Sequence, residues 1–166
     1  LGSYRQAIGA FGRLSPESDL APAAGYEIGY AWYDQKNPGR NLGNAVRALL
    51  KVPEKYPKSP DATRALLLVG RCYEELVEWS EAADTYQQII TNYPTSKHAE
   101  VAQLLLGHAL RGQEEYSQAI EAYDVIRKGG TERFPVDIVI DATLHKAETQ
   151  YLMGQYFEAG KTYLRV

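Results

Sequence analysis

The sequence predicts an all-α solenoid, in which antiparallel helix hairpins stack on one another. Three observations lead to this prediction. A short pattern recurs along the 166 residues at intervals of 37 to 40 positions. Within each copy the apolar residues follow the period of an α-helix. Proline or glycine then separates one periodic segment from the next, and no segment alternates convincingly as a strand does.

The recurring pattern is an aromatic residue or leucine, an alanine three positions later and a second large residue four positions after that. Its alanines, spaced by 38, 37, 37 and 40 residues, are Ala7, Ala45, Ala82, Ala119 and Ala159. Positions i, i+3 and i+7 lie along one helical face, so each copy predicts an amphipathic helix. Alanine lets a neighbouring helix approach closely, and we therefore expect Ala82 and Ala119 to be almost fully buried.

A second periodic helix precedes the later copies, whereas the first copy is a half repeat. Gly70 and Gly107 occupy equivalent positions in two such helices, 37 residues apart. Glycine inside a helix costs about 1 kcal/mol relative to alanine, so both need a reason. We attribute them to close packing between the two helices of a hairpin. The glycine-containing helices are expected to form the inner layer of the solenoid, and the alanine-containing helices the outer layer.

Proline and glycine mark the helix ends. Tyr56-Pro57 and Tyr93-Pro94 end two outer helices, because the residue before proline avoids the α region. Gly129-Gly130 ends the helix that begins near Tyr116, and Pro53 either shortens its helix or kinks the last turn. The expected helices cover approximately residues 2–14, 20–35, 41–52, 60–77, 79–92, 97–113, 115–128, 136–153 and 155–166.

These helices predict a single domain over residues 1–166. Its parts are a half repeat at 1–19 and repeats at 20–57, 58–94, 95–134 and 135–166. The chain begins without methionine and stops inside an expected helix, so we expect it to be a piece of a longer protein.

Composition argues against several classes of protein. The net charge of −3 and the pI of about 5.7 give no field that would attract nucleic acid. No apolar run approaches the roughly 18 residues that a membrane-spanning helix needs. The single Cys72 has no second thiol for a disulfide or a zinc site, and it is expected to be a small buried residue.

Nothing in the sequence predicts an enzyme, a cofactor or a metal site. It contains no phosphate-binding loop, no nucleophile elbow and no acidic metal cluster. The three histidines His98, His108 and His145 lie too far apart in sequence for a metal site on one helix, where ligands recur at three or four residues. We expect them to be ordinary surface or groove residues.

The best-formed copy resembles the tetratricopeptide repeat family, through Gly70, Tyr73, Ala82, Tyr86 and Pro94. The resemblance extends over nearly the whole chain. It implies a right-handed superhelical solenoid whose inner helices line a concave groove. It also implies a non-enzymatic protein that binds other proteins, although the fold alone does not specify the partner.

Two Tyr-Pro-x-Ser phrases, at residues 56–59 and 93–96, are similar to those of bacterial cell-envelope members of this family. Such members include the Tol–Pal coordinator and the tetratricopeptide lipoprotein of the outer-membrane β-barrel assembly machine. This resemblance implies a periplasmic or outer-membrane-associated location. The residues themselves leave the compartment open.

The family's groove positions imply a binding site on the inner helices. In this sequence they are Arg64, Leu67, Arg71, Leu104, His108, Arg111 and Tyr151, joined by the helical stripe Tyr26, Tyr30 and Tyr33. Arginine and tyrosine are enriched at binding hot spots. We expect the groove to take a peptide of some acidic character, with Arg71, His108 and Arg111 exposed along it. The alternative is that the arginines are merely solvated and the tyrosines pack between hairpins.

Two functions are consistent with these features. The first is an interaction scaffold that holds a segment of a partner protein in the groove, in an envelope assembly. The second is a self-assembly module that forms homo-oligomers through its terminal repeats. In that case Tyr163 and the last helix would present an apolar face to another copy or to further repeats.

Overall fold

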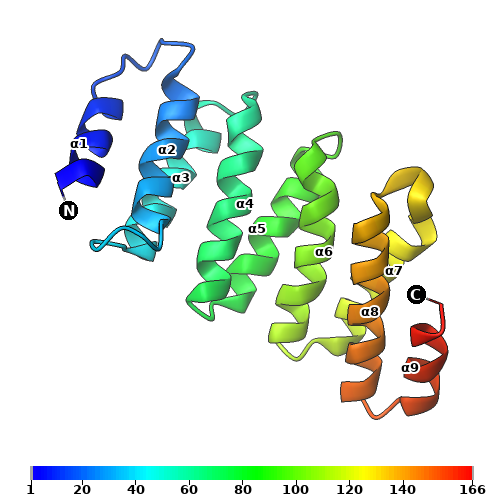
Figure 1. Ribbon diagram of the computed structural model, residues 1–166. Coiled ribbons are helices and arrows are strands. Elements are labelled where there is room, and N and C mark those ends of the chain that lie inside the picture. The colour runs from blue at the N-terminus through cyan, green and yellow to red at the C-terminus, as the bar shows by residue number, and fades with distance from the viewer. Residues whose placement is uncertain (1, 166) are drawn as a thin grey trace. The chain divides into compact units, whose positions relative to one another are not determined.

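The computed structural model describes residues 2–165, and within this range its regular elements are α-helices without strands (Figure 1). In chain order they are α1 (Gly2–Phe11), α2 (Ala21–Tyr33), α3 (Leu42–Lys55), α4 (Pro60–Glu75), α5 (Trp79–Asn92), α6 (Lys97–Gly112), α7 (Tyr116–Arg133), α8 (Val136–Leu152) and α9 (Tyr156–Tyr163). The all-α prediction is confirmed, and each expected helix is present. None of the described helices is both long and apolar enough to cross a membrane.

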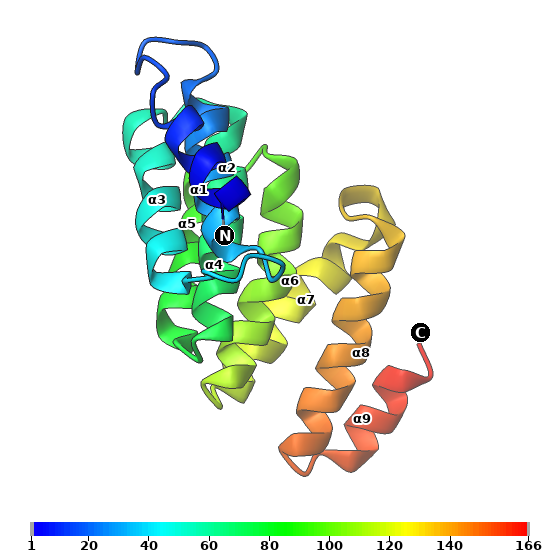
Figure 2. The same ribbon diagram turned by 60° about the vertical axis from the view of Figure 1, so that its left-hand side comes forward.

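Contacts within the chain divide it into two compact units, Leu1–Leu76 and Val77–Val166. Unit 1 contains α1 to α4, and unit 2 contains α5 to α9. Inside each unit, consecutive helices pack against each other, as the neighbouring α8 and α9 illustrate in both ribbon views (Figures 1 and 2). The helix pairs α2–α4 and α6–α8 are also in contact. The predicted single domain and its repeat borders stay predictions.

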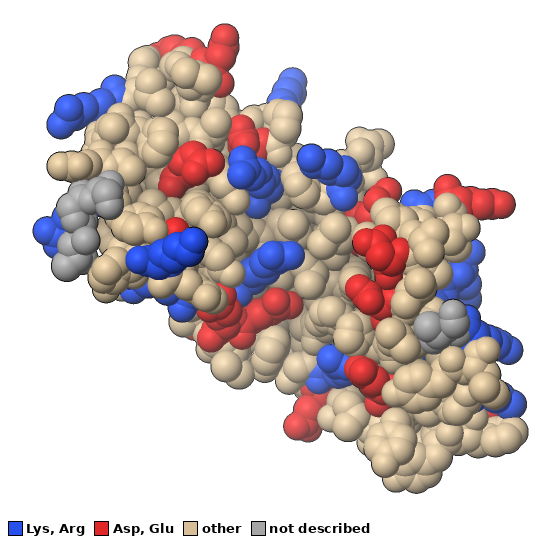
Figure 3. Space-filling model, in the orientation of Figure 1, with Lys and Arg blue, Asp and Glu red and all other residues tan. Residues whose placement is uncertain are grey.

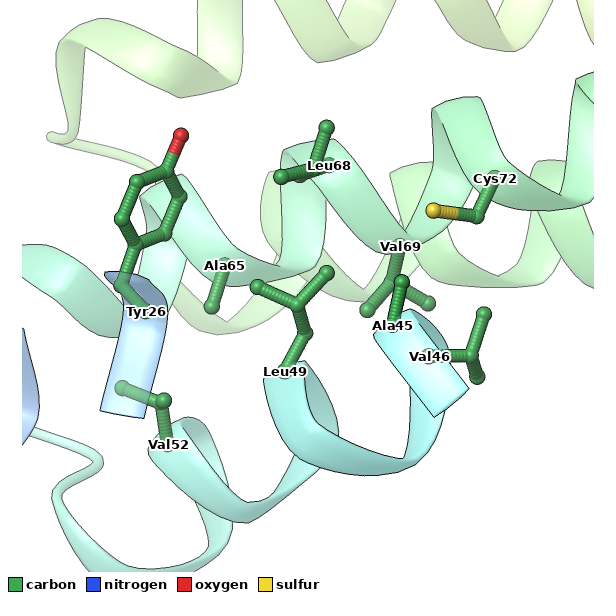
Figure 4. Close-up of a cluster of buried hydrophobic side chains, with 9 residues drawn as sticks. All are labelled: Tyr26, Ala45, Val46, Leu49, Val52, Ala65, Leu68, Val69 and Cys72. Carbon is green, nitrogen blue, oxygen red and sulfur yellow. The ribbon is translucent and has the colours of Figure 1, made fainter. Parts of the chain in front are cut away.

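The core of unit 1 is built between α2, α3 and α4 (Figure 4). Its buried side chains are Tyr26, Ala45, Val46, Leu49, Val52, Ala65, Leu68, Val69 and Cys72. Close approach of α2 and α3 depends on Gly29, where an added Cβ would lie only 2.3 Å from Cγ of Leu49. Cys72 is fully buried, as predicted for a small apolar residue.

Local sequence sets the ends of the unit 1 helices. The side chains of Asn41 and Ser59 cap α3 and α4 by accepting hydrogen bonds from backbone N–H groups of the first turn. Pro53 lies inside α3, which continues to Lys55. Of the two outcomes predicted for Pro53, shortening of the helix is therefore wrong.

The core of unit 2 follows the same design. A cluster between α6, α7 and α8 contains Leu104, Ala119, Tyr123, Ile126, Phe134, Ile138 and Ala142. Ala82 and Ala119 have no exposed surface, which confirms the prediction for the outer-helix alanines. Gly107 faces the ring of Tyr123, and an added Cβ would lie 2.3 Å from its Cε1. Close packing within the α6–α7 hairpin thus accounts for this glycine.

The largest difference from the predicted boundaries is at the end of α7. The helix was expected to stop at 128, but helical backbone continues to Arg133. Gly130 interrupts it with φ 56° and ψ −165°, a conformation that side-chain-bearing residues rarely adopt. The glycine pair thus breaks the regular helix as predicted, and a short helical segment follows it.

Candidate binding surfaces

The tyrosine stripe of α2 runs from the core of unit 1 to solvent. The rings of Tyr26 and Tyr30 are stacked, with centroids 6.2 Å apart and planes 22° apart. Tyr33 continues the stripe, with its ring centroid 6.3 Å from that of Tyr30. Tyr26 is buried, whereas 41% of Tyr30 is exposed. Tyr26 therefore anchors the stripe in the core, and Tyr30 presents its ring to solvent. Packing between helices describes Tyr26, whereas an accessible binding residue describes Tyr30.

Arg64, on α4, lies over the buried end of this stripe. Its guanidinium carbon is 3.8 Å from the centroid of the Tyr26 ring, a close cation–π contact. Its nitrogens also approach the carboxylates of Glu27, at 4.0 Å, and Asp61, at 3.8 Å. About half of the side chain, 48%, remains exposed, so the guanidinium is oriented but still accessible.

The other end of the stripe is closed by an ion pair. Arg40 pairs with Glu75, and its guanidinium lies 5.5 Å from the ring centroid of Tyr33. Burial and the nearby Glu75 carboxylate raise the pKa of Tyr33 to about 12, so its hydroxyl is neutral at pH 7. Sequence patterns did not single out Arg40 or Glu75 for this site.

Leu67 and Arg71 complete the predicted groove residues of unit 1. Both lie on α4, where Leu67 is half-buried and Arg71 is exposed. We refer to Tyr26, Tyr30, Tyr33, Arg64 and Arg71 as the tyrosine–arginine surface. In the space-filling view, basic and acidic side chains are interspersed over α2 and α4 (Figure 3).

In unit 2, α6 and α8 bring together a different group, the His108 cluster, which consists of His108, Arg111, His145 and Glu148. The two imidazole rings meet edge to face, with centroids 4.3 Å apart. Arg111 donates to Glu148 over 2.7 Å, and Nδ1 of His145 lies 3.0 Å from the same carboxylate oxygen. Glu148 therefore neutralises the charge that Arg111 would otherwise present.

The expectation that His108 is an exposed basic group is wrong. Its Nε2 is buried and has no hydrogen-bond partner among the described residues. Burial, together with the neighbouring His145 and Arg111, lowers the pKa of His108 to about 4, so the ring is neutral at pH 7. His145 and Arg111 hold the pKa of Glu148 below its ordinary value, although burial opposes them, and that carboxylate is ionised.

The two remaining groove residues of unit 2 lie apart from the His108 cluster. Leu104 is only 8% exposed and belongs to the core, so it offers little surface to a partner. Tyr151 is 60% exposed at the end of α8, and its ring packs edge-on against Tyr156 of α9, with centroids 5.0 Å apart.

A further ion network, between α7 and α8, was also not predicted. Asp124 accepts two hydrogen bonds from Lys146, at 2.7 and 2.8 Å, and pairs with Arg127 at 2.8 Å. Burial raises the pKa of Asp124, but these cations outweigh it and hold the pKa below its ordinary value. The network joins the two helices and is held among their own side chains, so we assign it a structural role. Among the described residues, no three metal-ligating side chains form a group that could hold an ion.

Comparison with known proteins agrees with this architecture. A family model described as tetratricopeptide repeat matches residues 64–96. A solved structure of MamA from Desulfovibrio magneticus RS-1 is 18% identical, with a TM-score of 0.71 over 99% of this chain and 84% of that one. The tetratricopeptide-like repeats of a putative kinesin light chain from Podosopora anserina are 15% identical, with a TM-score of 0.75 over 99% of this chain and 85% of that one.

No curated protein sequence matches the chain. The identities to the solved structures are low, so these likenesses establish the fold and not a shared role. Residues 64–96 are a tetratricopeptide repeat, and the chain as a whole has the fold of tetratricopeptide-repeat proteins.

Proposed function

We propose that this chain is a non-enzymatic scaffold that binds a segment of a partner protein on its inner helices. The observation that supports this most strongly is the tyrosine–arginine surface of unit 1. There the exposed ring of Tyr30 and the guanidinium of Arg64 both pack against the buried ring of Tyr26. Tyrosine and arginine are the residue types that most often dominate protein–protein binding energy.

The surface is also largely ordered before a partner arrives. Tyr30 rests on the buried Tyr26, and the guanidinium carbon of Arg64 lies 3.8 Å from the centroid of the Tyr26 ring. Fixing such side chains in advance lowers the entropy lost on binding. The ion pairs of Arg64 are long and exposed, so they contribute little stability and can be exchanged for a partner's carboxylate.

The two inner-helix surfaces differ in the partner that they suit. Arg64 and Arg71 in unit 1 are exposed cations, whereas Arg111 in unit 2 is already paired with Glu148. An acidic segment is therefore expected to engage unit 1 first. A place in a bacterial envelope assembly is part of this proposal, and it rests on the Tyr-Pro-x-Ser phrases at 56–59 and 93–96.

The test is capture of partners from a bacterial envelope extract. A double variant, Arg64→Glu with Arg71→Glu, is expected to lose proteins that the wild type retains, and to lose them most clearly at low salt. Lys58→Glu, an exposed change in unit 1 outside this surface, serves as the control. If the double variant retains the same proteins as the wild type at every salt concentration, the inner-helix surface of unit 1 is not the binding site.

A second candidate function is self-assembly, and one observation favours it. Tyr86, Tyr123 and Tyr163 are equivalent positions of the repeat, yet the first two have no exposed surface while Tyr163 is 43% exposed. Phe157, on the same helix, is 74% exposed, and Leu164, which follows Tyr163, is 90% exposed. The surface over α9 and the end of α8 carries few charges (Figure 3).

A second copy of the chain could cover this apolar face. Sedimentation velocity across a concentration series would then show dimers, and Tyr163→Ser with Phe157→Ser would shift the dissociation constant to higher concentration. A monomer at every concentration would remove this candidate and leave the scaffold proposal untouched.

A further inference from the structure

A cavity of about 250 Å³ lies in unit 1, where the end of α1 and the link that follows it meet α2 and α3. Its walls are mostly apolar and include Phe11, Leu14, Ile28 and Val52. The hydroxyl of Tyr56 donates to the carbonyl oxygen of Pro16 at 3.0 Å, which ties the link to the end of α3. The cavity thus has a defined set of walls, and this hydrogen bond holds two of its lining residues together.

The other links between an outer and an inner helix explain why space is left here. Each of them begins with an aromatic residue followed by proline: Tyr56, Tyr93 and Phe134. Phe134 is only 5% exposed, and it packs into the core of unit 2 above Gly129, where an added Cβ would lie 2.6 Å from its ring. The link between α1 and α2, residues 12–20, contains no aromatic residue. The large apolar side chain of this link that lines the cavity is Leu14, which is 37% exposed.

Two cations complete the cavity. Lys51 and Lys55 lie one turn apart on α3, line the cavity and are exposed. Neither forms an ion pair within the described part of the chain. Glu17, on the facing link, is engaged with the hydroxyl of Ser15. The cavity therefore combines apolar walls with two available positive charges.

We infer that this cavity receives an aromatic side chain of a partner peptide, and that acidic residues beside that side chain pair with Lys51 and Lys55. The cavity is smaller than the approximately 300–1,000 Å³ of pockets that enclose a drug-sized ligand, so one large side chain suits it better than a whole small molecule. Phe134 provides the internal precedent for a ring at such a junction. The inference rests on the proposed scaffold function, but it uses residues outside the tyrosine–arginine surface.

The test is fluorescence anisotropy with a labelled synthetic peptide, Gly-Glu-Asp-Phe-Asp-Glu-Gly, added to the whole chain. Saturable binding is expected. Replacing the peptide's phenylalanine with alanine should weaken binding about tenfold or more, as loss of a buried anchor does. A matched peptide with lysines in place of the acidic residues should bind more weakly still.

Variants of the protein locate the site. Ala48→Phe and Leu14→Trp each place a ring in the cavity and should weaken peptide binding about tenfold or more. Two filling variants are used because Ala48 is half-buried and its replacement could disturb the fold, while Leu14 is partly exposed. Lys51→Glu with Lys55→Glu should weaken binding chiefly at low salt, and Lys58→Glu should leave it unchanged.

Three outcomes would overturn the inference. They are equal binding of the phenylalanine and alanine peptides, wild-type binding by both filled variants, and no saturable binding of the acidic peptide. Dodecanoate is titrated in parallel, and binding of this fatty acid without binding of the peptide would reassign the cavity to a lipid. Arg64→Glu with Arg71→Glu should keep the preference for the phenylalanine peptide over the alanine peptide, so failure here is distinguishable from failure of the scaffold proposal.

Discussion

The inner-helix surfaces of the two units contrast sharply in charge, although the same repeat positions supply them. Arg71 in unit 1 and His108 in unit 2 are 37 residues apart, one repeat interval. Arg71 is an exposed cation, whereas His108 is a neutral ring with a buried Nε2. The difference comes from the following inner helix, where His145 and Glu148 lie against His108 and Arg111. A repeat position therefore fixes where a side chain lies, while the residue type and its contacts with the adjacent repeat set its charge and exposure.

Exchanging the two residues gives the largest expected effect. His108→Arg would place a second cation beside Arg111 in a half-buried site, where the carboxylate of the cluster, Glu148, is already paired with Arg111. An uncompensated buried charge typically costs about 3 kcal/mol or more in free energy of unfolding. Arg71→His, the reciprocal change on the exposed surface of α4, should stay within about 0.5 kcal/mol. Urea unfolding of both variants measures the two changes in free energy of unfolding. Similar decreases would mean that the two positions do not differ in burial.

The pH dependence of stability sharpens the same contrast. Because the pKa of His108 is lowered to about 4 in the folded chain, the folded state binds fewer protons than the unfolded state, whose histidine titrates near 6.5. The free energy of unfolding therefore has its full value above about pH 6.5. It decreases as the pH falls towards 4, by about 3 kcal/mol at most.

Unit 1 contains no histidine, so this dependence belongs to unit 2. Unfolding free energies measured between pH 7 and 5 should fall for the wild type and fall much less for His108→Leu. Above pH 5 the carboxylates with lowered pKa, which are Glu17, Asp34, Asp124 and Glu148, contribute little to the change. Parallel curves for the two proteins would contradict the assignment to His108.

The cores of the two units should behave alike where their surfaces differ. Ala45 in unit 1 and Ala119 in unit 2 are equivalent repeat positions without exposed surface. Ala45→Leu and Ala119→Leu should each overpack a helix contact and cost on the order of 1–3 kcal/mol. Denaturant midpoints provide the measurement. An unchanged midpoint for either variant would show that the alanine contact of that unit has room for a larger side chain.

The smallest effect is expected from the ion pair that neutralises Arg111. Its partner Glu148 is about half exposed, with 47% of its side chain accessible, so solvent screens the interaction. Glu148→Gln should cost at most about 1 kcal/mol. The same change should leave Arg111 available, and it is expected to increase binding of an acidic peptide by unit 2. No gain in binding at low salt would indicate that Arg111 stays inaccessible without its partner.

The helices could be predicted because their signals are local in sequence. The alanine spacing marks the outer helices, and a separate helical period marks the inner ones. The burial of Ala82 and Ala119 follows from the alanine pattern. The contact between His108 and His145 was missed because ligand-like pairs were sought within one helix, at three or four residues. The repeat interval of 37 was the available signal, since it places equivalent residues on the neighbouring helices α6 and α8.

The charge states and the cavity had weaker signals. Glu148 lies one repeat interval after Arg111, but its neutralisation of Arg111 depends on rotamers and distances across two helices, which the interval alone does not specify. The cavity of unit 1 depends on a residue that is absent, the aromatic side chain that opens the other links. A search for conserved patterns within the copies does not reveal what one copy lacks. The features that distinguish this chain from other proteins of the same fold therefore lie where its sequence departs from the repeat.

The packing of Trp79 against Gly112 has a spectroscopic consequence. An added Cβ at Gly112 would lie 2.4 Å from the indole, so this ring reports on the contact between α5 and α6 in unit 2. The chain has one other tryptophan, Trp32, which packs against the core of unit 1. Each unit thus carries a single tryptophan, which can be excited selectively over tyrosine. In Trp32→Phe and Trp79→Phe variants, denaturation of either unit can be followed without an added label, and separate midpoints would reveal two cooperative folding units.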